Sequence, residues 1–384
     1  MTNFLRSYAL KAFCASAVCA ALAGCGGGDG TAELAESRQA FARRDLKAAD
    51  KFADKAVKCN DRNVDALVNS ARVKIALAHL PEARRDIAKA VQLEGDADDV
   101  LLTDAEVAYL SKDYAKAVYD CRKVAEDASR PAEVRSQAYN VIGVVMWSAQ
   151  HNDEARVAFL RALRLNPRNP AAWYNLGRLY RDGFAGYDVA ALKAFEAFVH
   201  RAPDADVRVQ RVQRVDIKDL REAIARKTSS HPGAAQRDSE RAAKLIQEAQ
   251  DLARKGNPKN ALAKYEQAIK ADPLSFAAIV GKAEILPKAD RTPKGSERQL
   301  EAYKLACELQ GGNTDILLKA AQLAYKYKDH TADAVDLFSR ALASDPSNIQ
   351  ALDGLIASIR KLGGKEDVAK AYQSYREDLA ARRR

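Results

Sequence analysis

The sequence predicts an all-α protein in which pairs of helices repeat to form a solenoid. Three observations support this prediction: the composition favours helices, a residue pattern recurs at a fixed spacing, and few helix breakers interrupt the periodic segments. Of the 384 residues, 47% are hydrophobic and 30% are charged, with 19 Gly and 11 Pro. Ala, Leu and the straight-chain charged residues that dominate lose little side-chain entropy in a helix. This composition excludes a disordered or fibrous chain.

The recurring pattern is clearest near the middle of the chain. An aromatic residue, an apolar residue and a Gly occur twice, about 34 residues apart, as Tyr139, Ile142 and Gly143 and then as Trp173, Leu176 and Gly177. A second pattern of Ala, an aromatic residue and Pro follows each copy, as Ala155, Phe159 and Pro167 and then as Ala191, Phe195 and Pro203. Ala and Phe fall on one stripe of a helix, and Pro ends the helix because it has no N–H to donate.

These residues resemble the tetratricopeptide repeat (TPR), a family of protein-binding repeats. The resemblance implies two antiparallel helices in each unit, with the aromatic residue of one helix filling the space left by Gly or Ala on the other. It further implies that the first helix of each pair lines a concave groove, which holds an extended or helical peptide.

Weaker copies extend the pattern into two arrays. Residues 31–228 form an N-terminal array of about five units with a capping helix, and residues 239–384 form a C-terminal array of about four units. Ser, Pro and Gly gather at residues 229–238, which predicts a hinge. Residues 287–295 predict an inserted loop in the second array. Its aromatic ladder consists of Tyr265, Tyr303, Phe338 and Tyr372.

The predicted capping helix has two different faces. Its apolar face would cover the end of the first array, as the last repeat of a solenoid requires. Its basic face would be solvated, or would meet anionic lipid headgroups or an acidic partner; it consists of Arg211, Arg214, Lys218 and Arg221.

The N-terminus resembles a bacterial lipoprotein precursor. Arg6 and Lys11 precede an apolar run that is too short to span a bilayer and ends in Leu-Ala-Gly-Cys25. The resemblance implies that residues 1–24 are a signal peptide, that Cys25 carries lipid, and that the Gly-rich residues 25–30 are a tether. The alternative is an ordinary cleaved signal with a chance Cys. Export to the cell envelope is therefore expected, and Gly26, where Asp would suggest retention at the inner membrane, favours an outer-membrane anchor facing the periplasm.

The remaining cysteines and the net charge bear on cofactors and partners. Three cysteines remain, Cys59, Cys121 and Cys307, and none belongs to a C-x-x-C pair. We therefore expect them to be buried as small hydrophobic side chains, without disulfide bonds or metal. No cofactor is expected. The formal net charge of +10 favours acidic or carboxylate-terminated protein segments as partners. Nucleic acid is not expected, because an exported chain rarely meets it.

The register predicts which side chains line the grooves, although a solvated surface role is the alternative for each of them. In the first array the predicted peptide-binding residues are Arg72, Asn140, Trp147, Tyr174, Asn175, Arg178 and Arg181. In the second array they are Lys319, Lys326, Tyr327 and Arg360. Arg matches carboxylates, Asn bonds a peptide backbone, and Trp and Tyr offer rigid apolar contact. For Trp147 the alternative is packing beneath the neighbouring unit.

The sequence favours binding over catalysis. The five His are scattered, and no nucleophile elbow, phosphate loop or catalytic carboxylate pair is present. The leading hypothesis is a scaffold or assembly factor for outer-membrane, pilus or secretion machinery. The alternative is a regulatory or substrate-presenting subunit of an envelope enzyme such as a peptidoglycan synthase or a protease. A third hypothesis, a hydrolase with its site at residues 287–295, has less support.

Overall fold

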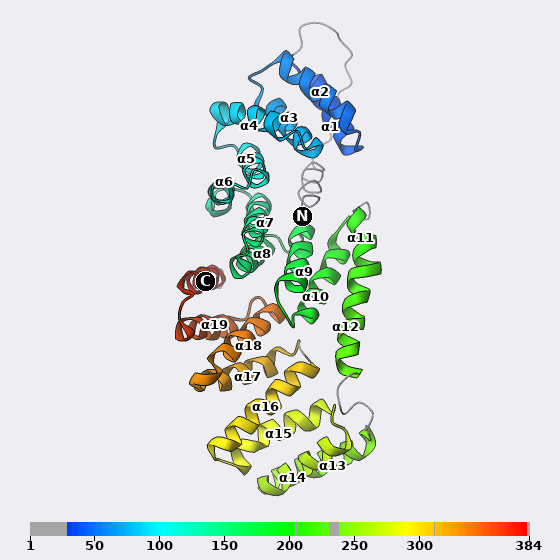
Figure 1. Cartoon of the computed structure of the whole chain (residues 1–384), viewed down its shortest axis with the longest axis vertical. Helices are drawn as coiled ribbons and strands as arrows, with labels where there is room; N and C mark the ends of the chain where they lie inside the picture. The colour runs from blue at the N-terminus through cyan, green and yellow to red at the C-terminus, as the bar shows by residue number, and fades with distance from the viewer. Residues whose placement is uncertain (1–28, 204–205, 230–237, 311, 382–384) are drawn as a thin grey trace. The chain divides into compact units, whose positions relative to one another are not determined.

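The computed structural model describes residues 29–203, 206–229, 238–310 and 312–381, and all regular elements in these ranges are helices (Figure 1). The predicted all-α class is confirmed. No helix in these ranges is long and apolar enough to cross a membrane. The chain divides into two compact units, one ending at Asn175 and one beginning at Leu176, and each is described by itself.

Unit 1 is a succession of helices joined by short turns. They are α1 (Thr31–Ala42), α2 (Leu46–Cys59), α3 (Val64–Leu77), α4 (Leu80–Glu94), α5 (Asp98–Leu110), α6 (Tyr114–Glu126), α7 (Ala132–Ser148), α8 (Asn152–Leu165) and the first part of α9 (Pro170–Gly183). From α1 to α8 each helix packs on the next, and the first helices of successive pairs, α1, α3, α5 and α7, also touch in turn.

Unit 2 continues with helices of the same kind. They are the rest of α9, α10 (Asp188–Arg201), α11 (Val207–Arg211), η2 (Val212–Asp216), α12 (Ile217–Ser229), α13 (Ser239–Arg254), α14 (Pro258–Ala271), α15 (Phe276–Ala289), α16 (Pro293–Leu309), α17 (Thr314–Lys326), η3 (Lys328–His330), α18 (Thr331–Ser344), α19 (Ile349–Leu362) and α20 (Glu366–Ala381).

Side-chain caps explain where many helices begin. The Asn63 side chain accepts a hydrogen bond from the Ala66 backbone N–H at 3.1 Å, and Asn348 accepts one from Ala351 at 2.9 Å. Each satisfies a backbone donor that the first turn of a helix leaves unpaired. Because Asn and Asp recur at these starts, short turns are enough to separate one helix from the next.

Close approach of a Gly to an aromatic ring sets the spacing of neighbouring helices. A Cβ atom added to Gly143 of α7 would lie 2.4 Å from the Phe159 ring of α8, and one added to Gly281 of α15 would lie 2.2 Å from the Tyr265 ring of α14. The same relation joins Gly177 to Phe195 and Gly354 to Phe338. The predicted packing within a repeat unit, with an aromatic residue in the space left by Gly, is confirmed at Gly143 and Gly177. Gly281 and Gly354 instead receive the ring of the preceding helix, which belongs to the neighbouring repeat unit.

The helix after α10 differs from its prediction in one respect. Val212, Ile217 and Leu220 are buried, and α12 packs on α10, as expected of a capping helix. Residues 212–216, however, form a π-helical turn that the sequence did not reveal. A π-helical turn inserts an extra residue into the helix, and Asp216 at its end is buried.

Two sequence expectations need correction and two lie outside the described residues. The predicted loop at 287–295 is largely helical, because the last turn of α15 accommodates Pro287 and Pro293 occupies the first turn of α16, where no N–H is needed. Cys121 and Cys307 are buried as expected, but Cys59 is exposed at the end of α2. The signal peptide with Cys25, and most of the 229–238 hinge, fall on residues 1–28 and 230–237, so these remain predictions.

Adding a methyl group at Gly143 should destabilise the repeat, because the new Cβ would overlap the Phe159 ring. We expect Gly143→Ala to lower the free energy of unfolding by about 1–3 kcal/mol, measured by urea titration. Combining it with Phe159→Leu should cost less than the sum of the two single changes, because the smaller side chain relieves the overlap. If the two losses simply add, the contact between Gly143 and Phe159 does not set the spacing of these helices.

Candidate functional site: the first helices of the repeats

Arg72 of α3 links one repeat to the next. Its side chain is buried, and its Nε donates a hydrogen bond to the Thr103 hydroxyl of α5 at 3.0 Å. The same guanidinium forms an ion pair with Asp99 at 2.7 Å. These contacts satisfy a charge that would be costly to bury alone, so Arg72 holds α3 against α5.

Asn140 and Asn175 lie in the interior of unit 1, not on an open surface. Both are fully buried, and the Asn175 side-chain amide donates to the Asn140 carbonyl oxygen at 2.9 Å, which joins α7 to α9. Trp147 is 8% exposed and packs within the unit. Tyr174 is partly buried on α9. The register placed these residues on the right helices, but the approach of the neighbouring helix covers most of them.

Carboxylates of the same chain accompany Arg178 and Arg181 in unit 2. Arg181 forms ion pairs with Asp182, at 2.6 Å, and with the buried Asp216 of the π-helical turn. Arg178 approaches Asp182 at 3.6 Å. The guanidinium of Arg181 also lies 5.6 Å from the centre of the Phe195 ring. The sequence predicts that a partner protein supplies the carboxylates for these arginines. In the structure, Asp182 and Asp216 of this chain already supply them.

The predicted residues of the second array are more accessible. The Lys319 ammonium pairs with Glu284 at 2.5 Å, and Arg360 pairs with Glu366 at 3.6 Å. The Tyr327 ring meets the His330 ring edge to face, with centroids 6.3 Å apart. Lys326 at the end of α17 is exposed.

Polar contacts join several first helices in register, and sequence reasoning missed them. Asn69 donates to the Ser37 hydroxyl at 2.8 Å, and the Tyr109 hydroxyl lies 2.9 Å from that of Ser148. The two residues of each pair are about one repeat length apart in the sequence. Polar residues that recur at this spacing are therefore the sequence signal that could have predicted these contacts. The first bond is buried and the second is partly buried, and such bonds fix the register in which one unit stacks on the next.

One carboxylate oxygen of Glu106 on α5 is buried without a hydrogen bond from the described residues. Its Oε1 is inaccessible and has no hydrogen-bond partner among the described residues, although the side chain as a whole is only partly buried. Burial raises the pKa of Glu106 to about 7, and the nearby positive charge of Arg72 opposes this rise. Nothing in the sequence distinguishes Glu106 from an exposed helical glutamate.

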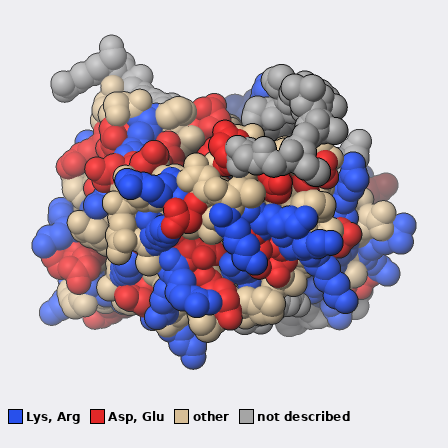
Figure 2. All heavy atoms as spheres, turned by 90° about the horizontal axis from the view of Figure 1, so that it is seen from above, with Lys and Arg blue, Asp and Glu red and all other residues tan. Residues whose placement is uncertain are grey.

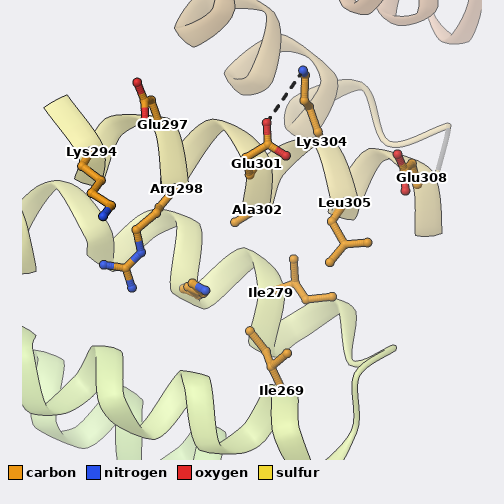
Figure 3. Close-up of a pocket in the computed structure, with 11 residues that line it drawn as sticks. Ile269, Ile279, Lys294, Glu297, Arg298, Glu301, Ala302, Lys304, Leu305 and Glu308 are labelled. Carbon is orange, nitrogen blue, oxygen red and sulfur yellow. Dashed lines mark ion pairs between the residues drawn. The ribbon is translucent and has the colours of Figure 1, made fainter. Parts of the chain in front are cut away.

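A pocket of about 690 Å³ lies between α14, α15 and α16 in unit 2 (Figure 3). Ile269, Ile279 and Leu305 provide apolar walls, and Lys and Glu side chains of α16 line the rest. The Lys304 ammonium lies 3.9 Å from Glu301. Side chains of both charge signs therefore line the pocket. Within the described ranges, no group of three or more His, Cys, Asp and Glu side chains could hold a metal.

Comparison with known proteins identifies the repeat. Residues 158–190 and 246–293 match two models of the tetratricopeptide repeat. The fold is a TPR solenoid. Among curated proteins, none matches the sequence significantly.

Solved structures with similar TPR arrangements share little sequence with this chain. The Pseudomonas aeruginosa protein pilF is 18% identical, with a TM-score of 0.41, and covers 53% of this chain and 93% of its own. A thermophilic TPR protein of Thermus thermophilus is 19% identical, with a TM-score of 0.43, and covers 50% of this chain and 99% of its own. YrrB, described as a TPR protein with an unusual peptide-binding site, is 18% identical, with a TM-score of 0.30 and coverages of 59% and 95%.

Replacing Glu106 by Gln should change the pH dependence of TPR stability. An acid whose pKa is raised by folding stabilises the folded state below its ordinary pKa of 4.5, and this contribution is lost as pH rises through about 7. We expect Glu106→Gln to match the wild type at pH 4 and to be more stable above pH 7, by at most about 3 kcal/mol. Urea unfolding across this range measures the difference.

Glu94→Gln is the matched control, because Glu94 is exposed on the neighbouring helix α4. This variant should follow the wild type at every pH. If Glu106→Gln does the same, burial does not raise the pKa of Glu106.

Proposed function

We propose that this chain is a protein-binding scaffold of the bacterial cell envelope, anchored through lipid on Cys25. The observation that carries the binding role is the TPR solenoid, whose matched repeats are those of protein-interaction proteins. The short apolar run before Cys25 and the Gly-rich residues after it support the anchor. Gly26 favours the outer membrane, facing the periplasm.

Acidic or carboxylate-terminated protein segments are the proposed partners. The formal net charge, +10 for the whole chain and +8 without residues 1–24, supports this choice. Positive and negative side chains are interspersed on the face shown in Figure 2, so this face has no single large basic field. Arg72 and Arg181, two of the predicted peptide-binding residues, already pair with carboxylates of this chain. The exposed cations of the second array are therefore the better candidates for binding a partner.

The proposed pathway is assembly of outer-membrane, pilus or secretion machinery. A regulatory or substrate-presenting subunit of an envelope enzyme is the alternative, because the same repeats serve both roles. The hydrolase hypothesis has the least support, because residues 287–295 are mostly helical and do not form the inserted loop that it assumed.

Lipid attachment should depend on Cys25. Changing Cys25 to Ala should abolish metabolic labelling by fatty acid and release the protein from the membrane fraction, because multiple acyl chains provide the anchoring energy. Cys19→Ala, in the apolar run before the cleavage site, is the matched control and should retain the label. Continued labelling of the Cys25 variant would refute the assignment.

Crosslinking in cells should capture discrete envelope proteins on the anchored chain. A tagged full-length chain, treated with a membrane-permeable crosslinker and analysed by mass spectrometry, should recover the same small set of proteins in repeated experiments. Components of an assembly machine would support the leading role, whereas an enzyme whose activity changes when the purified chain is added would favour the alternative. Recovery of no protein other than the chain itself would refute the scaffold function.

A further inference from the structure

Two large apolar side chains are exposed where α17 and α19 end. Tyr325 is 36% exposed and Leu362 is 50% exposed, whereas the apolar residues earlier in both helices are largely buried. The Lys361 ammonium lies 4.5 Å from the centre of the Tyr325 ring and also donates to the Tyr325 carbonyl oxygen. This contact joins the two helix ends into one surface.

The surface carries unmatched positive charge. Residues 325–328 and 360–365 contain five Lys or Arg and no Asp or Glu. Lys326, Lys328 and Lys365 are exposed, and no ion pair to them occurs among the described residues. Three acids, Asp329, Glu366 and Asp367, lie next to these segments, and Glu366 pairs with Arg360. The surface therefore remains basic.

Helix stability explains only part of this arrangement. A cation at a helix C-terminus is favoured by the helix dipole, and this accounts for the bond from Lys361 to the last turn of α17. Lys328 and Lys365 lie beyond the ends of α17 and α19. The dipole also gives no reason for leaving Tyr325 and Leu362 exposed. Tyr residues surrounded by polar groups are frequent at the energetic centre of protein interfaces.

We propose that this surface binds an acidic protein segment in which an apolar side chain lies between carboxylates. We name it the α17–α19 end surface, formed by Tyr325, Lys326, Lys328, Lys361, Leu362 and Lys365. The partner's carboxylates meet the exposed lysines, and its apolar side chain covers Leu362 and the edge of Tyr325. The proposal rests on the scaffold function and specifies where in unit 2, and by what chemistry, a partner binds.

A protein segment fits this surface better than an anionic membrane does. Proteins that lie on membranes use an extended amphipathic helix face with a continuous apolar side. Here the apolar residues stand at the ends of two helices, and the Lys361 ammonium covers a face of the Tyr325 ring. Leu362 alone would be left to insert between lipids, which provides little binding energy.

Fluorescent synthetic peptides test the proposal with the purified full chain. The probe is a short peptide of Asp and Glu around a central Leu; one matched peptide has Ser in place of Leu, and another has Asn and Gln in place of the acids. We expect the acidic Leu peptide to bind best, and salt to weaken it because exposed charges are screened. Lys326→Glu combined with Lys328→Glu should reduce its affinity at least tenfold, and Leu362→Ser about threefold or more.

Unit 1 offers a matched control of the same chemistry. Tyr119 on α6 is 61% exposed, and the Lys123 ammonium lies 5.0 Å from its ring centre. Tyr119→Ser with Lys123→Glu should leave peptide affinity unchanged. All these changes are at exposed positions, so helicity and melting temperature should stay close to the wild type.

Three outcomes would overturn the proposal. These are wild-type affinity in both α17–α19 variants, equal binding of the Leu and Ser peptides, and binding to phosphatidylglycerol vesicles, but not to peptides, that depends on Lys326 and Lys328. If crosslinking still captures partner proteins in any of these cases, the scaffold function stands and only the α17–α19 end surface is excluded. If crosslinking captures none, the scaffold function itself fails.

Discussion

The contact between Gly and an aromatic ring on the adjacent helix determines how the repeats pack. Without a side chain on Gly143 or Gly281, the helix backbone comes close enough for the Phe159 or Tyr265 ring to fill the gap. Protein interiors are packed so densely that one added methyl group must displace its neighbours. Gly143 receives the ring of the helix that follows, and Gly281 the ring of the helix that precedes. Both the pairing of helices and the stacking of pairs therefore depend on this contact.

Helices held this close bring polar side chains of successive repeats together. Arg72 reaches Thr103, and Asn175 reaches Asn140, because the first helices lie side by side at one repeat of separation. In unit 2 the π-helical turn buries Asp216, where it pairs with Arg181. Side chains whose types suit a peptide ligand are thus used to bind the next helix. Glu106 is the exception, because burial leaves its Oε1 without such a partner.

Periodicity made the fold predictable, but not the exposure of its polar residues. The spacing of Gly143 and Phe159 identifies the helix pair and its buried stripe from sequence alone. Whether Asn140 faces solvent depends on how close α9 comes to α7, and residue types alone do not reveal this distance. Pro287 predicts a loop because Pro interrupts hydrogen bonding, yet the last turn of α15 tolerates it. The π-helical turn at Val212–Asp216 has no strong sequence signal either.

Charge pairing separates the cations that hold the repeats together from those available to a partner. Arg72 is buried and pairs with Asp99, and Arg181 is partly exposed but pairs with the buried Asp216. Breaking either pair would leave a buried charge unmatched at a high cost in free energy. Lys326 and Lys328 are already solvated, and releasing water from an exposed ammonium costs far less than breaking a buried pair. To bind at the ends of α17 and α19, a partner carboxylate therefore has to displace only water. To bind Arg181, it would have to displace the carboxylate of Asp216. On this basis the second array is the more accessible binding surface, even though the first contains the clearest copy of the repeat.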